Sequence, residues 1–397
     1  MTASQPDLQT YAACLTPAAT GAIASLVVYG PQAWEIARRL IRLPSNVQQE
    51  LPGDPEPGRI MLARIGAEIA EQVVVTAKQL RPVPLVELHC HGGREVVRAV
   101  LELLEKEGAR LCSWQAFLDL TAGDTLRAAA AAELAGALTV RTASILLDQF
   151  HGAFATTINK LMASCEREDV ESGRRLLQEL QRHIKTGQHL TRPWQVVIAG
   201  APNVGKSSLV NALAGYQRCI VSPLPGTTRD VVTTVIAVDG WPVELADTAG
   251  LRHGAGTLEQ MGIGRAEQAL RSADLCLWIL DAAAQAHWPA FQSASLRYVV
   301  NKIDLAPLWD PGQAAGAVQV SAKTGAGIPE LCAAMAHWLV PEPPPAGAAV
   351  PFTPALGAAV EEAARLHSSR RFAAAREALA QACGNGETIV PGRSTGA

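Results

Sequence analysis

The sequence predicts an α/β domain with a mainly parallel, doubly wound sheet, which lies between two helical segments and follows a smaller α+β domain. Three observations predict this organisation. Over residues 192–341, short apolar runs alternate with helical stretches, which is typical of parallel sheets covered by helices. Residues 119–191 contain no strand-like run and are rich in Ala, Leu, Glu, Gln and Arg. Residues 1–118 mix strand-like runs with helical ones.

The composition indicates sizeable cores and no secretory or membrane segment. The chain has 397 residues, 48% of them hydrophobic, so about two or three domains are expected. The net charge is -3 without charge blocks, so composition neither indicates nor excludes a nucleic-acid partner. The eight cysteines form no C-x-x-C pair, and no apolar run approaches the roughly 18–20 residues that span a bilayer. We expect reduced thiols, a cytoplasmic location and no membrane contact.

The chain is predicted to divide into four segments. The first, residues 1–118, has strand-like runs at 23–29, 73–76 and 85–91 and helical runs at 33–41 and 94–107. The second, 119–191, should form long helices and end at a Thr-Arg-Pro breaker. The third, 192–341, has strand-like runs at 195–199, 233–238, 243–246, 275–280, 298–300 and 317–320. The fourth, 342–397, should be a proline-rich linker, a short helical remnant at 355–382 and a disordered tail.

A phosphate-binding loop is predicted at residues 200–207, which satisfy G-x-x-x-x-G-K-[ST] between a strand-like and a helical run. Its glycines let backbone N–H groups surround a β-phosphate at the positive end of the helix. Lys206 would supply positive charge to the β- and γ-phosphates, and the Ser207 hydroxyl would bind Mg²⁺.

Two further segments are placed to contact the γ-phosphate and the magnesium ion. Asp247 begins the sequence Asp-Thr-Ala-Gly after a strand-like run, where its carboxylate could hold Mg²⁺ through water and the Gly250 amide could meet the γ-phosphate. Thr228 lies in Pro-Gly-Thr-Thr-Arg-Asp, between the first helix and the next strand, and is the natural second hydroxyl ligand to Mg²⁺.

Two more motifs predict guanine recognition. Asn301-Lys302-Ile303-Asp304 follows a strand-like run, and the Asp304 carboxylate can accept two hydrogen bonds that guanine offers and adenine does not. Ser321-Ala322-Lys323 follows the next strand-like run and would complete the base pocket. The four motifs at 200–207, 247–250, 301–304 and 321–323 each follow a strand-like run. In this order they predict a P-loop GTPase.

Hydrolysis needs a group other than the glutamine that Ras-like enzymes use after D-x-x-G, because Leu251 occupies that position. Arg252, His253 and Glu259 lie in the same segment.

The motifs resemble those of the MnmE (TrmE) family of tRNA-modifying GTPases. The similar stretches are GAPNVGKSSLVNALAG, PGTTRD, DTAGLR, E-x-x-G-I-x-R-A from Glu259 to Ala266, and VELHCHGG at 86–93. This resemblance implies a G domain inserted in a helical domain, a homodimer formed through the N-terminal and G domains, and a role in tRNA wobble-uridine modification with a flavoprotein partner.

The resemblance also implies a potassium-assisted mechanism. The K⁺ ligands would be Asn203, Ser222, Leu224 and Thr227, and Glu259 would orient the attacking water as the catalytic residue. The residues assigned to GTP binding are Asn203, Val204, Gly205, Lys206, Ser207, Ser208, Ser222, Thr227, Thr228, Asp247, Thr248, Ala249, Gly250, Asn301, Lys302, Asp304, Ser321, Ala322 and Lys323.

The sequence departs from the family pattern at two places. The terminal Cys-x-Gly-Lys motif is replaced by Cys383 followed by Gly-Asn-Gly, which predicts a C-terminally truncated, divergent member in which Cys383 is not a catalytic thiol. The family's site for 5-formyltetrahydrofolate retains Glu87, but Val27 stands in place of its arginine and Thr121 in place of its lysine. We therefore expect folate to bind weakly.

Three alternatives remain open from the sequence. The chain could be a regulatory switch that associates with the ribosome or a partner, as Era-like and Der-like GTPases do, or a decayed paralogue with a structural role. His89 and His91 lie on one face of a strand and could suggest a metal site, although structural histidines are favoured because no third ligand is evident.

Overall fold

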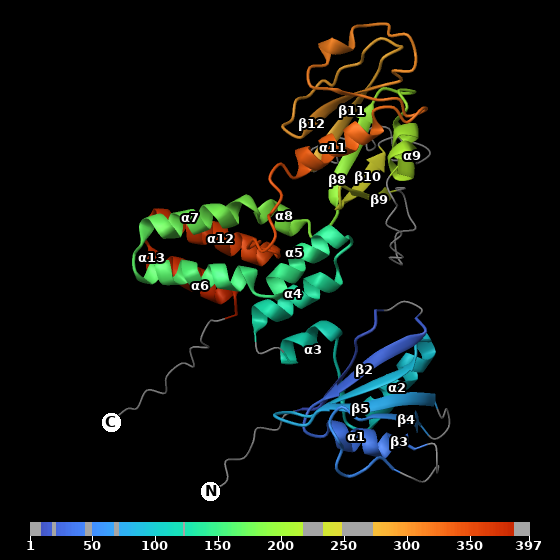
Figure 1. The fold of residues 1–397 in the computed structure, drawn as a ribbon, viewed down its shortest axis with the longest axis vertical. Helices are drawn as coiled ribbons and strands as arrows, with labels where there is room; N and C mark the ends of the chain where they lie inside the picture. Colours follow the sequence, from blue (N-terminus) through green and yellow to red (C-terminus); the bar gives the residue numbers. More distant parts are fainter. Residues whose placement is uncertain are drawn as a thin grey trace, which may run out of the picture. The chain divides into compact units, whose positions relative to one another are not determined.

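The computed structural model describes residues 9–17, 21–43, 50–66, 71–121, 124–216, 233–247 and 273–384 (Figure 1). The chain divides into two compact units, Met1–Gly123 and Asp124–Ala397. No helix in the described ranges is long and apolar enough to cross a membrane. The division lies between residues 123 and 124, whereas the sequence placed the start of the helical segment at residue 119.

The first unit is a mixed sheet with helices. Along the described chain its strands are ordered β3-β4-β5-β6-β2-β1-β7, and β1 and β7 are parallel whereas the other neighbours are antiparallel. The elements are β1 Tyr11–Cys14, β2 Ile23–Tyr29, α1 Ala33–Leu40, β3 Ile41–Arg42, β4 Ile60–Ile65, β5 Glu71–Gln79, β6 Leu85–His91, α2 Arg94–Lys106, β7 Arg110–Leu111 and α3 Trp114–Thr121. The predicted strands at 23–29 and 85–91 are confirmed.

The core of the first unit lies on one face of this sheet. Leu26 and Val28 of β2 and Leu88 of β6 are fully buried in the same cluster as residues of α1 and α2. Because successive side chains of a strand point to opposite faces, Val27 and Glu87 lie on the other face, where α3 places Phe117 against Val27.

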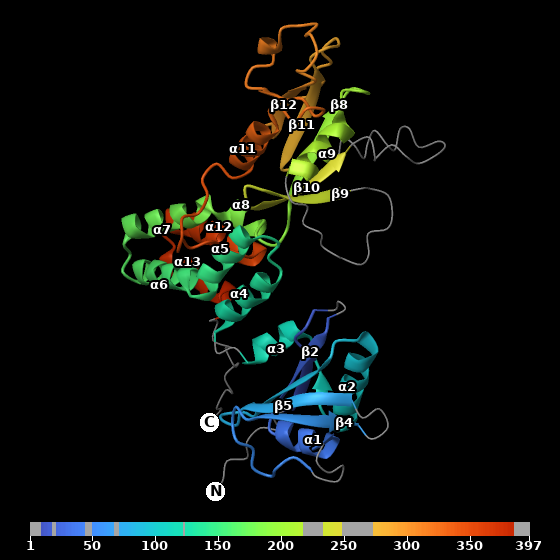
Figure 2. The same ribbon diagram turned by 45° about the vertical axis from the view of Figure 1, so that its right-hand side comes forward.

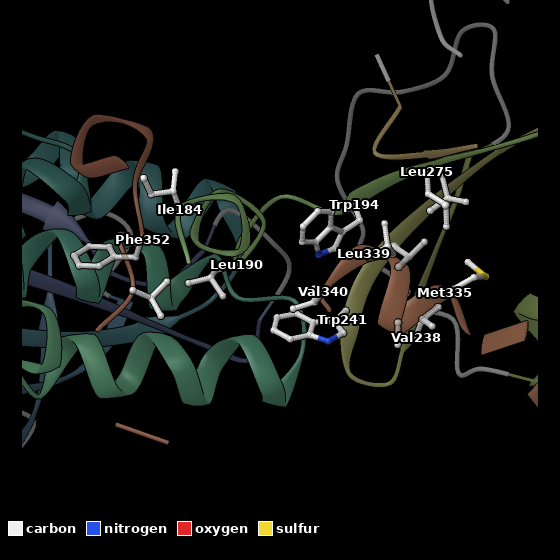
Figure 3. Close-up of a cluster of buried hydrophobic side chains, with 14 of the residues drawn as sticks. Ile184, Leu190, Trp194, Val238, Trp241, Leu275, Met335, Leu339, Val340 and Phe352 are labelled. Atoms are coloured by element: carbon white, nitrogen blue, oxygen red, sulfur yellow. The ribbon is translucent and has the colours of Figure 1, made fainter. Parts of the chain in front are cut away.

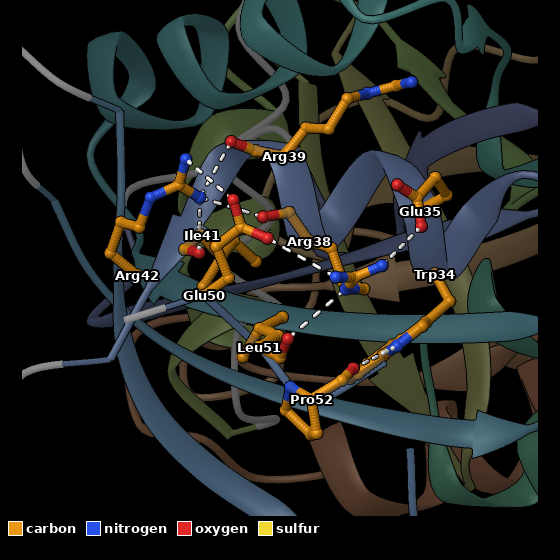
Figure 4. A network of polar contacts seen from close by, with 9 residues as sticks. All are labelled: Trp34, Glu35, Arg38, Arg39, Ile41, Arg42, Glu50, Leu51 and Pro52. Atoms are coloured by element: carbon orange, nitrogen blue, oxygen red, sulfur yellow. Dashed lines mark hydrogen bonds and ion pairs between the residues drawn. The ribbon is translucent and has the colours of Figure 1, made fainter. Parts of the chain in front are cut away.

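Polar contacts attach the segment after α1 to that helix (Figure 4). Trp34 Nε1 donates to the Pro52 carbonyl at 3.0 Å, and Arg38 Nε donates to the Leu51 carbonyl at 3.3 Å. Arg38 also pairs with Glu35 and Glu50, whose side chains are half exposed, so these ion pairs add little stability. The hydrogen bonds from Trp34 and Arg38 to backbone carbonyls therefore hold the segment Leu51–Pro52 against α1, before the chain enters β4.

The second unit contains a mainly parallel sheet, as predicted. Over its described residues the strand order is β13-β12-β11-β8-β10-β9, and only the β9–β10 pair is antiparallel. Helices α9 and α11 lie side by side against it (Figure 2). The elements are β8 Trp194–Gly200, α9 Lys206–Tyr216, β9 Thr233–Val238, β10 Trp241–Asp247, β11 Leu275–Asp281, β12 Leu296–Asn301, the short 3₁₀ helix Pro311–Gln313, β13 Val318–Gln319 and α11 Ile328–Leu339.

The remaining helices of this unit come from both sides of the sheet in sequence. They are α4 Thr125–Ala135, α5 Val140–Phe150, α6 Ala153–Glu166, α7 Val170–Arg182, α8 Ile184–Gln188, α12 Pro354–Ser368 and α13 Phe372–Ala382. Helix α12 packs against α7 and α8, and α13 packs against α6.

The long helices predicted for residues 119–191 are instead a series of short ones. Breaks occur where the backbone turns left-handed, with φ 96° at Gly152 and 53° at Glu168, and the Asp169 side chain then caps α7. The helical stretch predicted at 355–382 is present as α12 and α13, which are separated near Arg370, where φ is 57°.

A hydrophobic cluster joins the helices and the sheet within the second unit (Figure 3). Trp194 and Trp241 are buried in it together with Leu190 and Val340. The turn between β9 and β10 is also bonded to the start of α5, where Thr139 Oγ1 donates to the Gly240 carbonyl at 2.6 Å. The sheet and the helices therefore share a core.

Candidate nucleotide site

The predicted phosphate-binding loop connects the end of β8 to the start of α9. Its backbone is left-handed at Asn203 and Gly205, with φ 63° and 93°, and φ is 145° at Gly200. A Cβ atom at Gly205 would lie 2.4 Å from Asn301 Nδ2, and one at Gly200 would lie 2.6 Å from the Ile279 carbonyl oxygen. Both glycines are therefore required by close neighbours as well as by backbone conformation.

Lys206 lies over this loop at the positive end of α9. Its Nζ donates to the carbonyls of Ala201 at 2.9 Å and Gly200 at 3.2 Å. Ser207 and Ser208 follow on the first turn of the helix, where both are exposed. An ammonium, serine hydroxyls and the helix N-terminus in one place provide the donor set that suits a phosphate and a magnesium ion.

Asn301 connects the guanine motif to the phosphate-binding loop. It ends β12, is buried, and its Nδ2 donates to the Val204 carbonyl at 2.9 Å. Its Oδ1 accepts from the Ala322 amide at 3.0 Å. One side chain therefore holds together three segments that the sequence predicted as separate contributors to the site.

Asp304 presents an ionised carboxylate at the same edge of the sheet. Ser321 Oγ donates to Asp304 Oδ1 at 2.6 Å, and this hydrogen bond, with smaller contributions from Lys323 and Lys302, holds the pKa of Asp304 below its usual range. Ser321 is fully buried, so its hydroxyl is fixed. An ionised carboxylate accepts hydrogen bonds and donates none, which is the chemistry that guanine recognition needs.

One residue of this site was missed by the sequence reasoning. Asp281 ends β11, and its Oδ2 lies 2.6 Å from Lys302 Nζ, which also donates to the Asn203 carbonyl at 2.8 Å. The sequence does contain a feature that could have indicated Asp281: it is an acidic residue directly after the apolar run Leu275–Leu280, and parallel strands place such residues at the edge where ligands bind.

Many predicted site residues lie outside the described residues. They are Ser222, Leu224, Thr227, Thr228, Thr248, Ala249, Gly250 and Glu259. Asp247 ends β10, which pairs in parallel with β8, so its backbone reaches the edge where the phosphate-binding loop begins. Of the assigned metal ligands, Asn203 and Ser207 are described, and the structure brings both to one loop.

In the first unit, Glu87 and Val27 are opposite each other in neighbouring strands. The Glu87 carboxylate lies 3.3 Å from Lys78 Nζ, and Val27 is 1% exposed. His89 Nδ1 lies 2.9 Å from Ser25 Oγ, and His91 Nδ1 lies 2.5 Å from Glu71 Oε1. The two rings thus have separate partners, as expected of structural histidines.

Two other positions named from the sequence have contacts of their own. Thr121 Oγ1 donates to the Phe117 carbonyl at 2.8 Å within α3. Cys383 is buried after α13, and burial together with the negative charge of Asp124 raises the pKa of its thiol to about 11. A thiol that stays protonated at neutral pH is a poor nucleophile.

Comparisons with known proteins match parts of both units of the chain. A family model described as "GTP-binding protein TrmE N-terminus" matches residues 10–117, and one described as "50S ribosome-binding GTPase" matches residues 195–305. The tRNA modification GTPase MnmE of Acaryochloris marina is 33% identical over 357 residues, covering 78% of this chain and 77% of that protein. The chain belongs to the MnmE family.

Further relatives fall in the same family. MnmE of Geobacillus kaustophilus is 35% identical over 316 residues, which cover 69% of this chain and 67% of that protein. Among solved structures, the G domain of the T. maritima FeoB iron transporter is 25% identical to this chain, and the match covers 37% of this chain and 99% of that domain, with a TM-score of 0.27.

As an MnmE-family member, the chain is a GTP-binding GTP hydrolase that uses Mg²⁺. The comparisons do not favour the regulatory-switch alternative.

Proposed function

We propose that this chain couples GTP hydrolysis to modification of the wobble uridine of tRNA. The observation that supports this most directly is the contact of Asn301 with both the phosphate-binding loop and Ala322, beside the ionised Asp304. This arrangement suits GTP, and the match of residues 10–117 to the TrmE N-terminal family model adds the domain that accompanies tRNA modification in the relatives.

In this proposal, the described residues bind the nucleotide at three points. Backbone amides of residues 203–208 and the Lys206 ammonium bind the phosphates, Ser207 binds Mg²⁺, and Asp304 accepts hydrogen bonds from guanine. Thr228, the Asp247–Gly250 segment and Lys323 would add the remaining contacts.

Potassium-assisted hydrolysis is part of the same proposal. Asn203, with oxygens of Ser222, Leu224 and Thr227, would hold K⁺ beside the phosphates, where positive charge stabilises the charge that develops on the transferred phosphoryl group. Glu259 would orient the attacking water, since Leu251 cannot. The left-handed backbone of Asn203, held at its carbonyl by Lys302, supports this role because it defines where that side chain starts.

The proposed architecture has four segments: 1–118, an N-terminal α+β domain; 119–191, the first part of a helical domain; 192–341, the G domain inserted in it; and 342–397, a linker, helices and tail. The packing of α12 and α13 on α6 and α7 supports the insertion. The chain would act in the cytoplasm as a homodimer formed through its N-terminal and G domains, with tRNA and a flavoprotein as partners.

The tRNA role is tested by profiling wobble modifications in a strain that lacks this chain. We expect the modification to be lost and to be restored by the parent chain, but not by an Asp304→Ala variant that cannot bind GTP. A normal wobble profile in the deletion strain would contradict the proposal.

The potassium role is tested by comparing GTP hydrolysis in KCl and NaCl at equal ionic strength. We expect hydrolysis to be at least about tenfold faster in KCl, which corresponds to about 1.4 kcal/mol of activation free energy. Asn203→Ala should remove the difference while the chain still binds nucleotide. Equal rates in the two salts, at protein concentrations that allow dimerisation, would exclude the potassium mechanism.

A further inference from the structure

The Lys302 side chain connects the guanine motif to the phosphate-binding loop. Its backbone is left-handed, with φ 67°, a conformation that costs free energy for a residue with a Cβ atom. The ammonium crosses to donate to the Asn203 carbonyl at 2.8 Å. Asn301 donates to the next carbonyl, that of Val204. Consecutive carbonyls of the loop are thus held by consecutive side chains of the guanine motif.

Asp281 holds that ammonium from the other side. Its Oδ2 lies 2.6 Å from Lys302 Nζ, and its Oδ1 accepts from the Ala283 amide at 2.9 Å. The carboxylate side chain is 8% exposed, whereas that of Lys302 is 33% exposed. Both carboxylate oxygens are therefore used, one by a charged donor and one by the backbone.

The backbone at Asp281 is also fixed. Trp309 Nε1 donates to the Asp281 carbonyl at 2.7 Å, and the Ala282 amide donates to the Asn301 carbonyl at 2.9 Å. The carboxylate thus starts from a rigid point between β11 and β12. A rigid, buried anion restricts the long side chain of Lys302 to one rotamer and lowers the entropy cost of its bond to the loop.

We propose that Asp281 is a positioning residue of the GTPase site. It holds the Lys302 ammonium against the Asn203 carbonyl, and so couples the segment that binds guanine to the loop residue assigned to phosphate and potassium. Only the part of this inference that concerns potassium rests on the proposed function. The coupling itself concerns nucleotide binding, which follows from the chain's membership of the family.

The informative substitution is Asp281→Asn. An amide has one acceptor oxygen, whereas Asp281 meets two donors, Lys302 Nζ and the Ala283 amide, so one contact must be lost. Release of a fluorescent GDP analogue should become about tenfold faster or more, the effect of losing one charge-assisted hydrogen bond. The KCl concentration that gives half-maximal hydrolysis should also rise, while preference for GTP over xanthosine triphosphate stays as in the parent because Asp304 is unchanged.

A double-mutant cycle separates positioning from general stability. If Asp281 acts through Lys302, then Asp281→Asn should have little further effect on GDP release in a Lys302→Met background. The matched control is Asp239→Asn, a neutralised exposed acid in the β9–β10 turn of the same unit, which should release GDP at the parental rate.

Two results would overturn the proposal. The first is parental GDP release in Asp281→Asn, which with a fall in thermal stability is the result for a purely structural residue. The second is an equal acceleration of GDP release with and without Lys302. If the parent chain hydrolyses GTP equally in KCl and NaCl, the potassium part of the proposed function fails, and the GDP-release cycle still decides the role of Asp281.

Discussion

Replacement of Asn301 by alanine should loosen the nucleotide site even without nucleotide. The side chain is 2% exposed and makes two hydrogen bonds, a buried one to the Val204 carbonyl and a partly buried one from the Ala322 amide. Asn301→Ala would leave both backbone groups without this partner, and each buried unsatisfied group costs about 1–3 kcal/mol. The two groups together would cost about 2–6 kcal/mol, and since the Ala322 amide is only partly buried and water can reach it, we expect a total below the middle of that range, about 3 kcal/mol.

Hydrogen–deuterium exchange is the suitable assay because the chain has two units and need not unfold in one step. A loss of about 3 kcal/mol corresponds to roughly a hundredfold faster exchange of the amides in the start of α9 and the end of β12. The control is Asn159→Ala, which removes an exposed amide from α6 and should leave exchange in those segments unchanged. Parental exchange in Asn301→Ala would refute the view that this side chain joins the segments of the site.

Three further predictions concern base choice, folate and pH. Asp304→Asn should shift nucleotide preference from GTP toward xanthosine triphosphate, because the amide offers a donor where the carboxylate offers only acceptors; full retention of GTP preference in competition binding would contradict the assigned base pocket. Calorimetry should show weak or no binding of 5-formyltetrahydrofolate, since Val27 provides no charge beside Glu87, with partial recovery in Val27→Arg; a Kd of about 1 μM or tighter for the parent chain would contradict this. Burial lowers the pKa of His367, whose Nε2 has no partner among the described residues, so the unfolded chain takes up a proton first as pH falls. The contribution of His367 to the free energy of unfolding should be complete above about pH 7 and should fall as the pH drops through about 6.5. In urea unfolding, the free energy of unfolding of His367→Leu should therefore fall less between these pH values than that of the parent chain, and an equal fall would contradict the prediction.

Local patterns predicted the strands and the helices of the nucleotide unit well. The apolar run at 275–280 became β11, because a buried parallel strand needs a continuous apolar stretch and the flanking residues end it. The run at 233–238 became β9, the antiparallel strand at the edge of the sheet. Helix lengths in 124–188 were predicted less well. The breaks at Gly152 and Glu168 depend on single left-handed residues, and the Ala- and Leu-rich composition around them favours a continuous helix.

The short edge strands of the first unit were missed for a related reason. Strands β3 Ile41–Arg42 and β7 Arg110–Leu111 have two residues each, too few to show a period of two. They exist because neighbouring strands supply their hydrogen-bond partners, as when the Arg110 amide donates to the Thr10 carbonyl. Such partners are a tertiary property that a local pattern does not contain.

The nucleotide site shows the same limit more sharply. Motif spacing correctly places Asn301 and Asp304 at a strand end, but spacing alone assigns the asparagine no role beyond belonging to the motif. Its contact with Val204 joins residues 97 positions apart, and the contact of Lys302 with Asn203 joins residues 99 apart. Both follow from the parallel arrangement of β8, β11 and β12, which brings their carboxyl ends to one edge. Once that topology is known, an acid at the end of β11 necessarily lies beside the lysine that follows β12, and the role of Asp281 becomes visible.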